Sequence, residues 1–184
     1  EVIEQAIPKA ATFDQYFEKS YRGGVITALG TYQYAAAGHA AVVLGIARRS
    51  LEEIACIASE RKRLQSTETI AMGSVFRSEF MKNVALFEAA RALVHEAYRA
   101  AEGTVLAGEP VSNLQVARIR QAVTWAHTAA RDIVMFAFSA GASASLRNPS
   151  VIGRCLRDVT VAGQHIIVDP TTLVDAAPVT IDHW

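Results

Sequence analysis

Apolar side chains recur at spacings of three and four residues along two long stretches of this chain. The first stripe consists of Leu44, Ala47, Leu51, Ile54 and Ala58, and the second of Val116, Ile119, Val123, Ala126, Ala130, Ile133, Ala137 and Ala140. This spacing places side chains on one face of an α-helix, which turns once in about 3.6 residues. It predicts one helix over 31–64 and another from Ser112 to just before Arg147.

Two further helices and a short one complete the predicted fold. A helical pattern begins near Ser66 and fades at a turn, and another runs from Pro149 to Val168. Asp169 and Pro170 then predict a cap and a short helix. No strand-like alternation competes with these patterns. The sequence therefore predicts an all-α fold, an antiparallel up-and-down four-helix bundle with a short extra C-terminal helix.

Length and charge limit the domain organisation and the partners. The 184 residues suit one domain over 25–184, and residues 1–24, which end in two glycines, are expected to be a linker from an upstream domain. Eighteen basic residues balance eighteen acidic ones, so no nucleic-acid binding is expected. The longest apolar run, 35–47, is shorter than the ~20 residues that span a bilayer, so no membrane association is expected.

Few side chains carry an obvious chemical motif. Cys56 and Cys155 lack a CxxC pattern and are expected to be structural free thiols of a cytoplasmic protein. No metal-binding motif is present, so no metal is predicted. The scattered histidines are expected to be helix-surface or core residues; these are His39, His95, His127 and His183. His165, in RDVTVAGQHIIV, lies among aliphatic residues on an expected helix, and the pattern alone makes it a core residue.

Three segments, in order, resemble a known family. They are VVLGIARRSLEEIACIASERKRLQ, FEAARALVHEAYRAAE and AGASASLRNPSVIGRCLRD. They resemble the C-terminal helical domain of acyl-CoA dehydrogenase-like flavoproteins, over nearly the whole chain, and are most similar to the branch of flavin-dependent monooxygenases. The resemblance implies upstream helical and β-domains that help to enclose flavin and substrate.

The resemblance also implies cofactor-binding residues. Arg61, in SERKRL, matches an arginine that reaches the flavin phosphates across a subunit interface, although Leu64 and Gln65 replace the Phe-Gly pair frequent in the family. Gly141, Ala142 and Ser143 fall in the place of a small-residue segment that receives the cofactor of a neighbouring subunit. The implied cofactor is reduced flavin, FMN or FAD.

His165 becomes the candidate catalytic residue in this family. The glutamate base of the dehydrogenases would fall at Ile166, and no acidic residue lies between Glu18 and Glu52 to replace it from the first long helix. The monooxygenase branch has a histidine where His165 stands. An imidazole can hydrogen-bond at the reactive edge of the flavin or accept a proton from a phenol.

The resemblance thus implies the oxygenase component of a two-component monooxygenase that hydroxylates an aromatic or heterocyclic small molecule. Its expected partners are a separate flavin reductase and further copies of itself, as a homotetramer. This fragment alone is not expected to be active. Two alternatives remain open: an acyl-CoA dehydrogenase with its base elsewhere, and a non-catalytic helical oligomerisation module. A β-domain encoded upstream of Glu1 would favour an enzyme.

Overall fold

The computed structural model describes residues 28–62 and 66–184, and this part of the chain is helical. The described chain has three long helices, α4 (Thr31–Glu60), α5 (Ser74–Leu106) and α6 (Asn113–Gly141), together with shorter elements. The short elements are η1 (Ile70–Met72), α7 (Ser143–Leu146), α8 (Val151–Ala162), η2 (Ile166–Val168) and α9 (Thr171–Ile181). Within the described ranges the β-structure is limited to one isolated bridge, between Lys62 and Thr69. The all-α prediction is confirmed, and the predicted linker, 1–24, lies outside the described residues.

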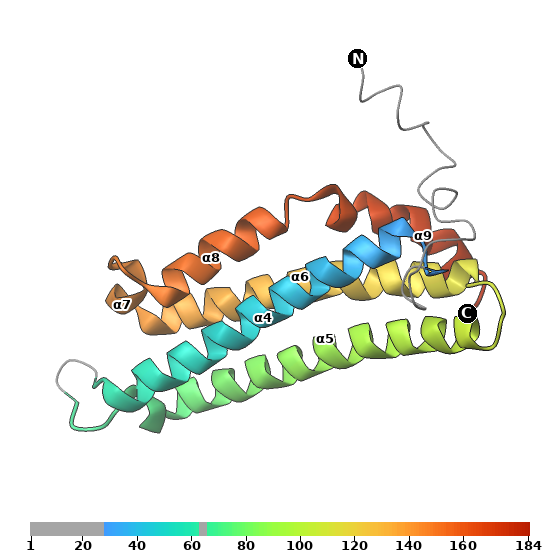
Figure 1. Cartoon of the computed structure of the whole chain (residues 1–184). Helices are drawn as coiled ribbons and strands as arrows, with labels where there is room; N and C mark the ends of the chain where they lie inside the picture. Colours follow the sequence, from blue (N-terminus) through green and yellow to red (C-terminus); the bar gives the residue numbers. More distant parts are fainter. Residues whose placement is uncertain (1–27, 63–65) are drawn as a thin grey trace, which may run out of the picture.

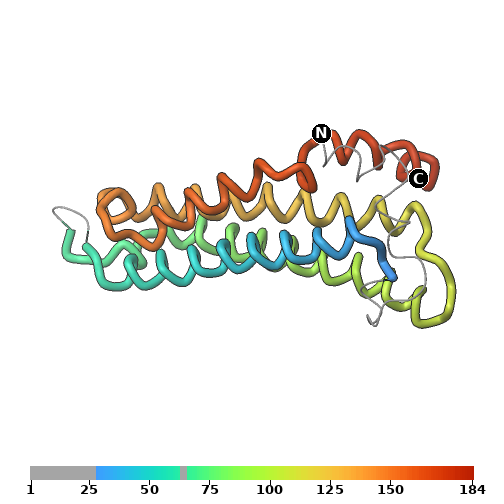
Figure 2. Tube along the Cα trace, turned by 45° about the horizontal axis from the view of Figure 1, so that its top comes forward, coloured from blue at the N-terminus to red at the C-terminus, as the bar shows by residue number. Residues whose placement is uncertain are grey.

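The long helices lie side by side along the molecule, and α8 packs on α4 and α6 (Figures 1 and 2). α6 is the central element, because it contacts α4, α5, α8 and α9. α9 packs on α6 at the end of the molecule opposite α7 (Figure 1). No helix of the described chain is long and apolar enough to cross a membrane.

The predicted apolar stripes form the core. The α6 residues Ile119, Val123, Ala126, Ala130, Ile133 and Ala137 are all at most 1% exposed. They share the core with α4 residues of the same spacing, which are Ala36, Ala40, Val43, Ala47, Leu51, Ile54 and Ala58. Alanine at so many facing positions lets the two backbones approach closely, and the close approach fixes the register of α4 against α6.

Local backbone chemistry sets the helix ends. Ser112 and Gln115 form a capping box at the start of α6, as each side chain bonds to the other's backbone N–H. α4 stops at Glu60, before the predicted Leu64, because Arg61 adopts an extended conformation with φ −94° and ψ 141°. α5 begins at Ser74 instead of near Ser66.

The prediction of a fourth helix through Val168 is wrong. α8 ends at Ala162, and Gly163 and Gln164 form a turn after it. His165 therefore lies on no α-helix, and it is exposed instead of buried among aliphatic side chains. The predicted short helix is present as α9, whose N-cap is Pro170, and Oδ1 of Asp169 accepts a hydrogen bond of 2.8 Å from the Thr171 N–H.

Both cysteines are free, as predicted, but their surroundings differ. Cys155 is buried in the core. Cys56 is exposed on α4, where its Sγ lies 3.7 Å from Oε1 of Glu60.

Candidate functional site

Three imidazoles from distant parts of the sequence meet beside η2. The ring centroid of His39, on α4, lies 4.2 Å from that of His165 and 5.9 Å from that of His127, on α6. His127 is buried, His39 is partly buried and His165 is exposed. The packing of α4, α6 and η2 thus forms a cluster that runs from the core to the surface, which we call the histidine cluster.

His165 has a defined hydrogen-bonding role at the surface end of the cluster. It is the N-cap residue of η2, and its Nδ1 accepts a hydrogen bond of 3.2 Å from the Ile167 N–H. An acceptor nitrogen carries no proton, so the neutral ring holds its proton on Nε2. His165 therefore presents an Nε2–H donor on an exposed side chain.

His127 has the opposite arrangement. Its Nδ1 lies 2.9 Å from the Val123 carbonyl oxygen, which can only accept, so the proton is on Nδ1. Its Nε2 is buried and has no hydrogen-bond partner in the described structure. Burial lowers the pKa of His127, and the neighbouring His39 and His165 add to that effect against the opposing Val123 hydrogen bond. The inner ring of the cluster is therefore neutral at pH 7.

Tyr32 ties η2 to α4, the helix that carries His39. Its hydroxyl donates a hydrogen bond to the Ile167 carbonyl, and the Arg120 guanidinium lies 4.8 Å from the centre of its ring. Burial raises the pKa of Tyr32, so the hydroxyl keeps its proton and remains a donor. Since Tyr32 and His39 are two turns apart on α4, one helix face both anchors η2 and contacts His165.

The predicted cofactor residues lie elsewhere, at the end of the molecule where α4 and α6 finish (Figure 1). Arg61 is exposed directly after α4, and its guanidinium has no ion pair among the described residues. Gly141 ends α6, and Ala142 and Ser143 are exposed at the start of α7. The Ala142 N–H already donates to the Ser139 carbonyl oxygen, so the clearest donor for phosphate oxygens at this end is the Arg61 guanidinium.

The glycine of this segment is packed by its own chain. A Cβ atom on Gly141 would lie 2.2 Å from the Ser145 Oγ, a buried hydroxyl that has no partner in the described structure. Ala142 has a positive φ of 47°, which turns the chain sharply between α6 and α7. The accessible part of the predicted segment is therefore Ala142 and Ser143.

The two groups of residues are far apart within one chain. His39 and the end of α4 at Glu60 are separated by 21 helical residues, or about 30 Å at the usual helical rise. The candidate catalytic residue, His165 beside His39, and the candidate flavin-binding residue Arg61 therefore lie near opposite ends of α4.

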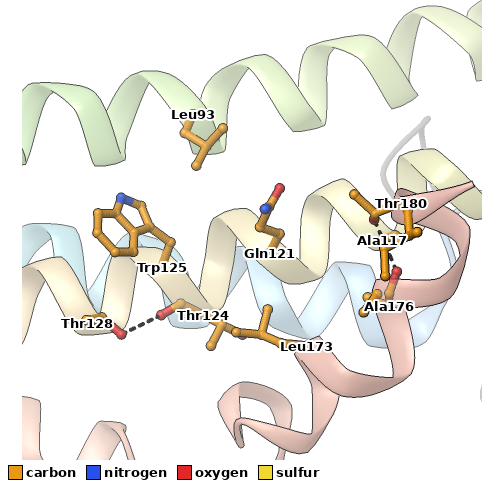
Figure 3. Close-up of a pocket in the computed structure, with 11 residues that line it drawn as sticks. Leu93, Ala117, Gln121, Thr124, Trp125, Thr128, Leu173, Ala176 and Thr180 are labelled. Carbon is orange, nitrogen blue, oxygen red and sulfur yellow. Dashed lines mark hydrogen bonds between the residues drawn. The ribbon is translucent and has the colours of Figure 1, made fainter. Parts of the chain in front are cut away.

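A separate groove is lined by none of the three clustered histidines. It has a volume of about 540 Å³ and lies between α5, α6 and α9. Figure 3 shows Leu93 of α5 facing Trp125 and Gln121 of α6, with Leu173 of α9 on the other side. No ionisable side chain lines it. It therefore offers no acid, base or cation for chemistry, and we do not assign it to the candidate site.

The described part of the chain holds no cluster of three or more His, Cys, Asp or Glu residues with a geometry suited to a metal ion. The histidine cluster fits this result, because a ring-centroid separation of 4.2 Å between His39 and His165 describes ring packing. Its chemistry is that of hydrogen bonding and proton transfer.

Comparison with known proteins identifies relatives of most of the helical region. The sequence model of the family described as acyl-CoA dehydrogenase, C-terminal domain, matches residues 37–170. The indole-3-acetate monooxygenase of Pseudomonas putida is 30% identical over 135 residues, which are 73% of this chain and 35% of that protein.

Solved structures show the same fold. XiaF from Streptomyces sp., in complex with FADH2 and glycerol, superposes with a TM-score of 0.75 at 19% identity, over 83% of this chain and 39% of that one. The 3-HSA hydroxylase from Rhodococcus sp. RHA1 superposes with a TM-score of 0.73 at 16% identity. The match covers 82% of this chain and 38% of the hydroxylase chain. The chain spans little more than a third of the length of each of these relatives.

Proposed function

The chain belongs to the acyl-CoA dehydrogenase family, whose C-terminal domain it matches, and from that premise we propose that it is part of a flavin-dependent monooxygenase. The proposed protein is the oxygenase component of a two-component system. It receives reduced flavin, FMN or FAD, from a separate reductase and hydroxylates an aromatic or heterocyclic substrate. The relative named indole-3-acetate monooxygenase, at 30% identity, supports this activity.

The observation that carries the proposal is the exposed imidazole of His165 in a cluster without carboxylates. The groups that shift the pKa of His39 and of His127 are other histidines, besides burial and a backbone carbonyl. Ile166 stands where a dehydrogenase base would be expected, and α4 has no acidic residue before Glu52. Abstraction of a proton beside a thioester needs a carboxylate base, so this site favours oxygenation over acyl-CoA oxidation.

His165 is proposed as the catalytic residue. Because its Nδ1 accepts a hydrogen bond from the Ile167 N–H, the ring carries its proton on Nε2 and can donate a hydrogen bond from there to an oxygen atom of a ligand. Reduced flavin, when bound, supplies the electrons that activate dioxygen. The contribution of this chain is then to present the Nε2–H of His165 as a hydrogen-bond donor at the reaction site.

Arg61, Ala142 and Ser143 are proposed to hold flavin phosphates, with Gly141 shaping the turn. Because about 30 Å of α4 separates His39 from the helix end before Arg61, the flavin that Arg61 holds is one used by another subunit. This sharing requires a homo-oligomer, which we propose to be a tetramer. Val42 on α4 and Met135 on α6, 57% and 45% exposed, leave apolar surface for such contacts.

An assay with the protein that contains this chain tests the proposal. The protein is mixed with reduced FMN or FAD in air, together with indole-3-acetate or a simple phenol, and product is quantified per reduced flavin consumed. Hydroxylated product is expected. Reduction of an electron-acceptor dye by acyl-CoA substrates, with no oxygenated product, would instead support the dehydrogenase. Absence of both activities with flavin bound would refute an enzymatic role.

A further inference from the structure

His39 is the member of the histidine cluster that contacts both other rings. It lies between a buried imidazole, His127 at 5.9 Å, and an exposed one, His165 at 4.2 Å, as measured between ring centroids. The planes of His39 and His165 are inclined by 43°, so the two rings pack obliquely. An exposed histidine thus has a partner ring as well as a backbone partner, the Ile167 N–H.

Two contacts of this kind restrict the ring of His165. The hydrogen bond from Ile167 fixes Nδ1 as the acceptor, and the packing of His39 limits rotation about the side-chain bonds. An exposed side chain without such contacts samples several rotamers, and its ring exchanges between both neutral tautomers. The geometry around His165 therefore selects one orientation and one tautomer.

The charge state of His39 suits this packing. Burial lowers the pKa of His39, and the neighbouring His165 lowers it further. The titratable groups that face His39 are His165, from the α8–η2 connection, and His127, from α6. No carboxylate contributes to either shift within the described structure. His39 is consequently neutral at pH 7 and does not repel a proton on its neighbour.

We propose that His39 is a positioning residue for His165: its uncharged ring packs on the His165 ring and holds it with Nδ1 on the Ile167 amide and Nε2–H free for a ligand. The catalytic meaning of this role rests on the proposed function. The orientation itself is a property of this chain and can be measured without flavin.

Nitrogen NMR on the 184-residue chain at pH 7.5 tests the orientation, because the ¹⁵N shifts of an imidazole distinguish its two tautomers. In the natural chain we expect His165 to be almost entirely the Nε2–H form. His39→Ala should raise the population of the Nδ1–H form several-fold. His39→Phe restores a packing ring and should retain most of the natural tautomer preference. An unchanged His165 spectrum in His39→Ala overturns the proposal.

Two control variants separate positioning from general loss of stability. Tyr98→Phe removes the hydrogen bond from the Tyr98 hydroxyl to the Gln33 carbonyl, which lies outside the cluster. It should lower the melting temperature without changing the His165 nitrogen shifts. His95→Ala, on the exposed face of α5, should change neither. If Tyr98→Phe alters the His165 tautomers as strongly as His39→Ala, the effect is only structural.

The electrostatic contact has its own measurement. The titration midpoint of His39, followed by its ring proton, should rise in His165→Gln because a group that lowers the pKa of His39 has been removed. A midpoint that does not move contradicts the proposed contact.

Activity in the longer protein links the inference to the proposed function. His39→Ala should lower product per reduced flavin several-fold through kcat, with little change in KM for the substrate, and His39→Phe should regain part of the loss. If the natural protein shows no oxygenation but His39→Ala still changes the His165 tautomer population, the proposed function is wrong and the positioning role of His39 is supported. If oxygenation is present and His39→Ala leaves both the ratio and the tautomers unchanged, the positioning role fails alone.

Discussion

The hydroxyl oxygen of Ser145 fills the space beside Gly141, since a Cβ atom at Gly141 would lie only 2.2 Å from it. Gly141→Ala should therefore destabilise the protein by about 1–3 kcal/mol, the usual cost of overpacking a core. Gly103→Ala is the control, because nothing lies within 4 Å of its added Cβ, and it should be neutral or stabilising.

A double variant tests the cause of that loss. Ser145→Ala removes the clashing oxygen and also a buried hydroxyl without a partner. Gly141→Ala combined with Ser145→Ala should thus recover most of the melting temperature lost by Gly141→Ala alone. If the effects of the two substitutions on the free energy of unfolding, measured by urea denaturation, are simply additive, the contact between residues 141 and 145 does not cause the loss of stability.

The second prediction concerns the flavin affinity of the longer protein. Arg61→Ala should weaken the binding of reduced flavin about tenfold or more, because a charge-assisted hydrogen bond contributes about 1.5–3 kcal/mol. Arg99→Ala, an exposed arginine on α5, is the matched control and should leave the dissociation constant unchanged. Anaerobic fluorescence titration measures the dissociation constant of each variant for reduced flavin. Equal constants for the two variants would show that Arg61 does not bind flavin.

The third prediction concerns His165 itself. In the longer protein, His165→Ala should leave folding and flavin binding largely intact, because the side chain is exposed, while hydroxylated product falls and hydrogen peroxide rises. His183→Ala, also exposed, serves as the control. The measurement is the ratio of product to reduced flavin, beside a thermal melt. A normal ratio with a lowered melting temperature would identify His165 as a structural residue.

The fourth prediction is a loss of stability in mild acid. The pKa of His127 is lowered from 6.5 in the folded chain, mainly by burial, and that of His39 is lowered in the same direction. Below pH 6.5 the unfolded chain therefore binds more protons than the folded one. Stability should be highest above pH 6.5 and fall as the pH drops towards the folded pKa values.

Calorimetry at pH 7.5, 6.5 and 5.5 measures this effect. His127→Leu removes the most buried titrating ring, so its melting temperature should change less over the same interval than that of the natural chain. The quantity compared is the change in melting temperature between pH 7.5 and 5.5 in each protein, and the absolute melting temperatures do not enter the comparison. An equal acid dependence in both proteins would show that His127 does not contribute.

The fifth prediction concerns the start of α6. Ser112→Ala removes the side-chain acceptor of the Gln115 N–H and should cost about 1 kcal/mol, or about 2–4 °C in melting temperature for a chain of this size. Ser78→Ala, at an exposed position inside α5, is the control and should be neutral or slightly stabilising. Equal melting temperatures in the two variants would contradict a role for the cap.

The long helices could be predicted because their burial is periodic in sequence. The stripe from Val116 to Ala140 needs only local spacing to be recognised, and Ser112 is a recognisable cap. The predicted helix ends were less accurate than the predicted helices themselves. The apolar periodicity of α4 does not indicate that Arg61 adopts an extended conformation. The apolar residues after Ala162 continue a helical pattern in the sequence, although the helix ends there and Gly163 is its C-cap.

The histidine cluster was missed because it depends on contacts between distant elements. His127 follows Val123 by four residues within the buried stripe of α6, and His39 adjoins the buried Ala36 and Ala40 of α4. These positions point both rings towards the interior. This was the feature of the sequence from which the burial of the two histidines could have been predicted. That the two interiors meet at η2 follows from helix packing, which no local pattern contains. The roles of His165, Arg61 and the Gly141–Ser143 segment stay predictions.

α4 carries His39 near its beginning and leads into Arg61 at its end, about 30 Å further along the helix. With the flavin shared between subunits as proposed, each polypeptide supplies parts of two different sites. In genetic terms, His165→Ala and Arg61→Ala then damage separate functions of one gene. A mixed oligomer of the two variant chains contains sites that combine an intact His165 from one chain with an intact Arg61 from the other. Co-expression should therefore restore activity that neither variant has alone, as in intragenic complementation.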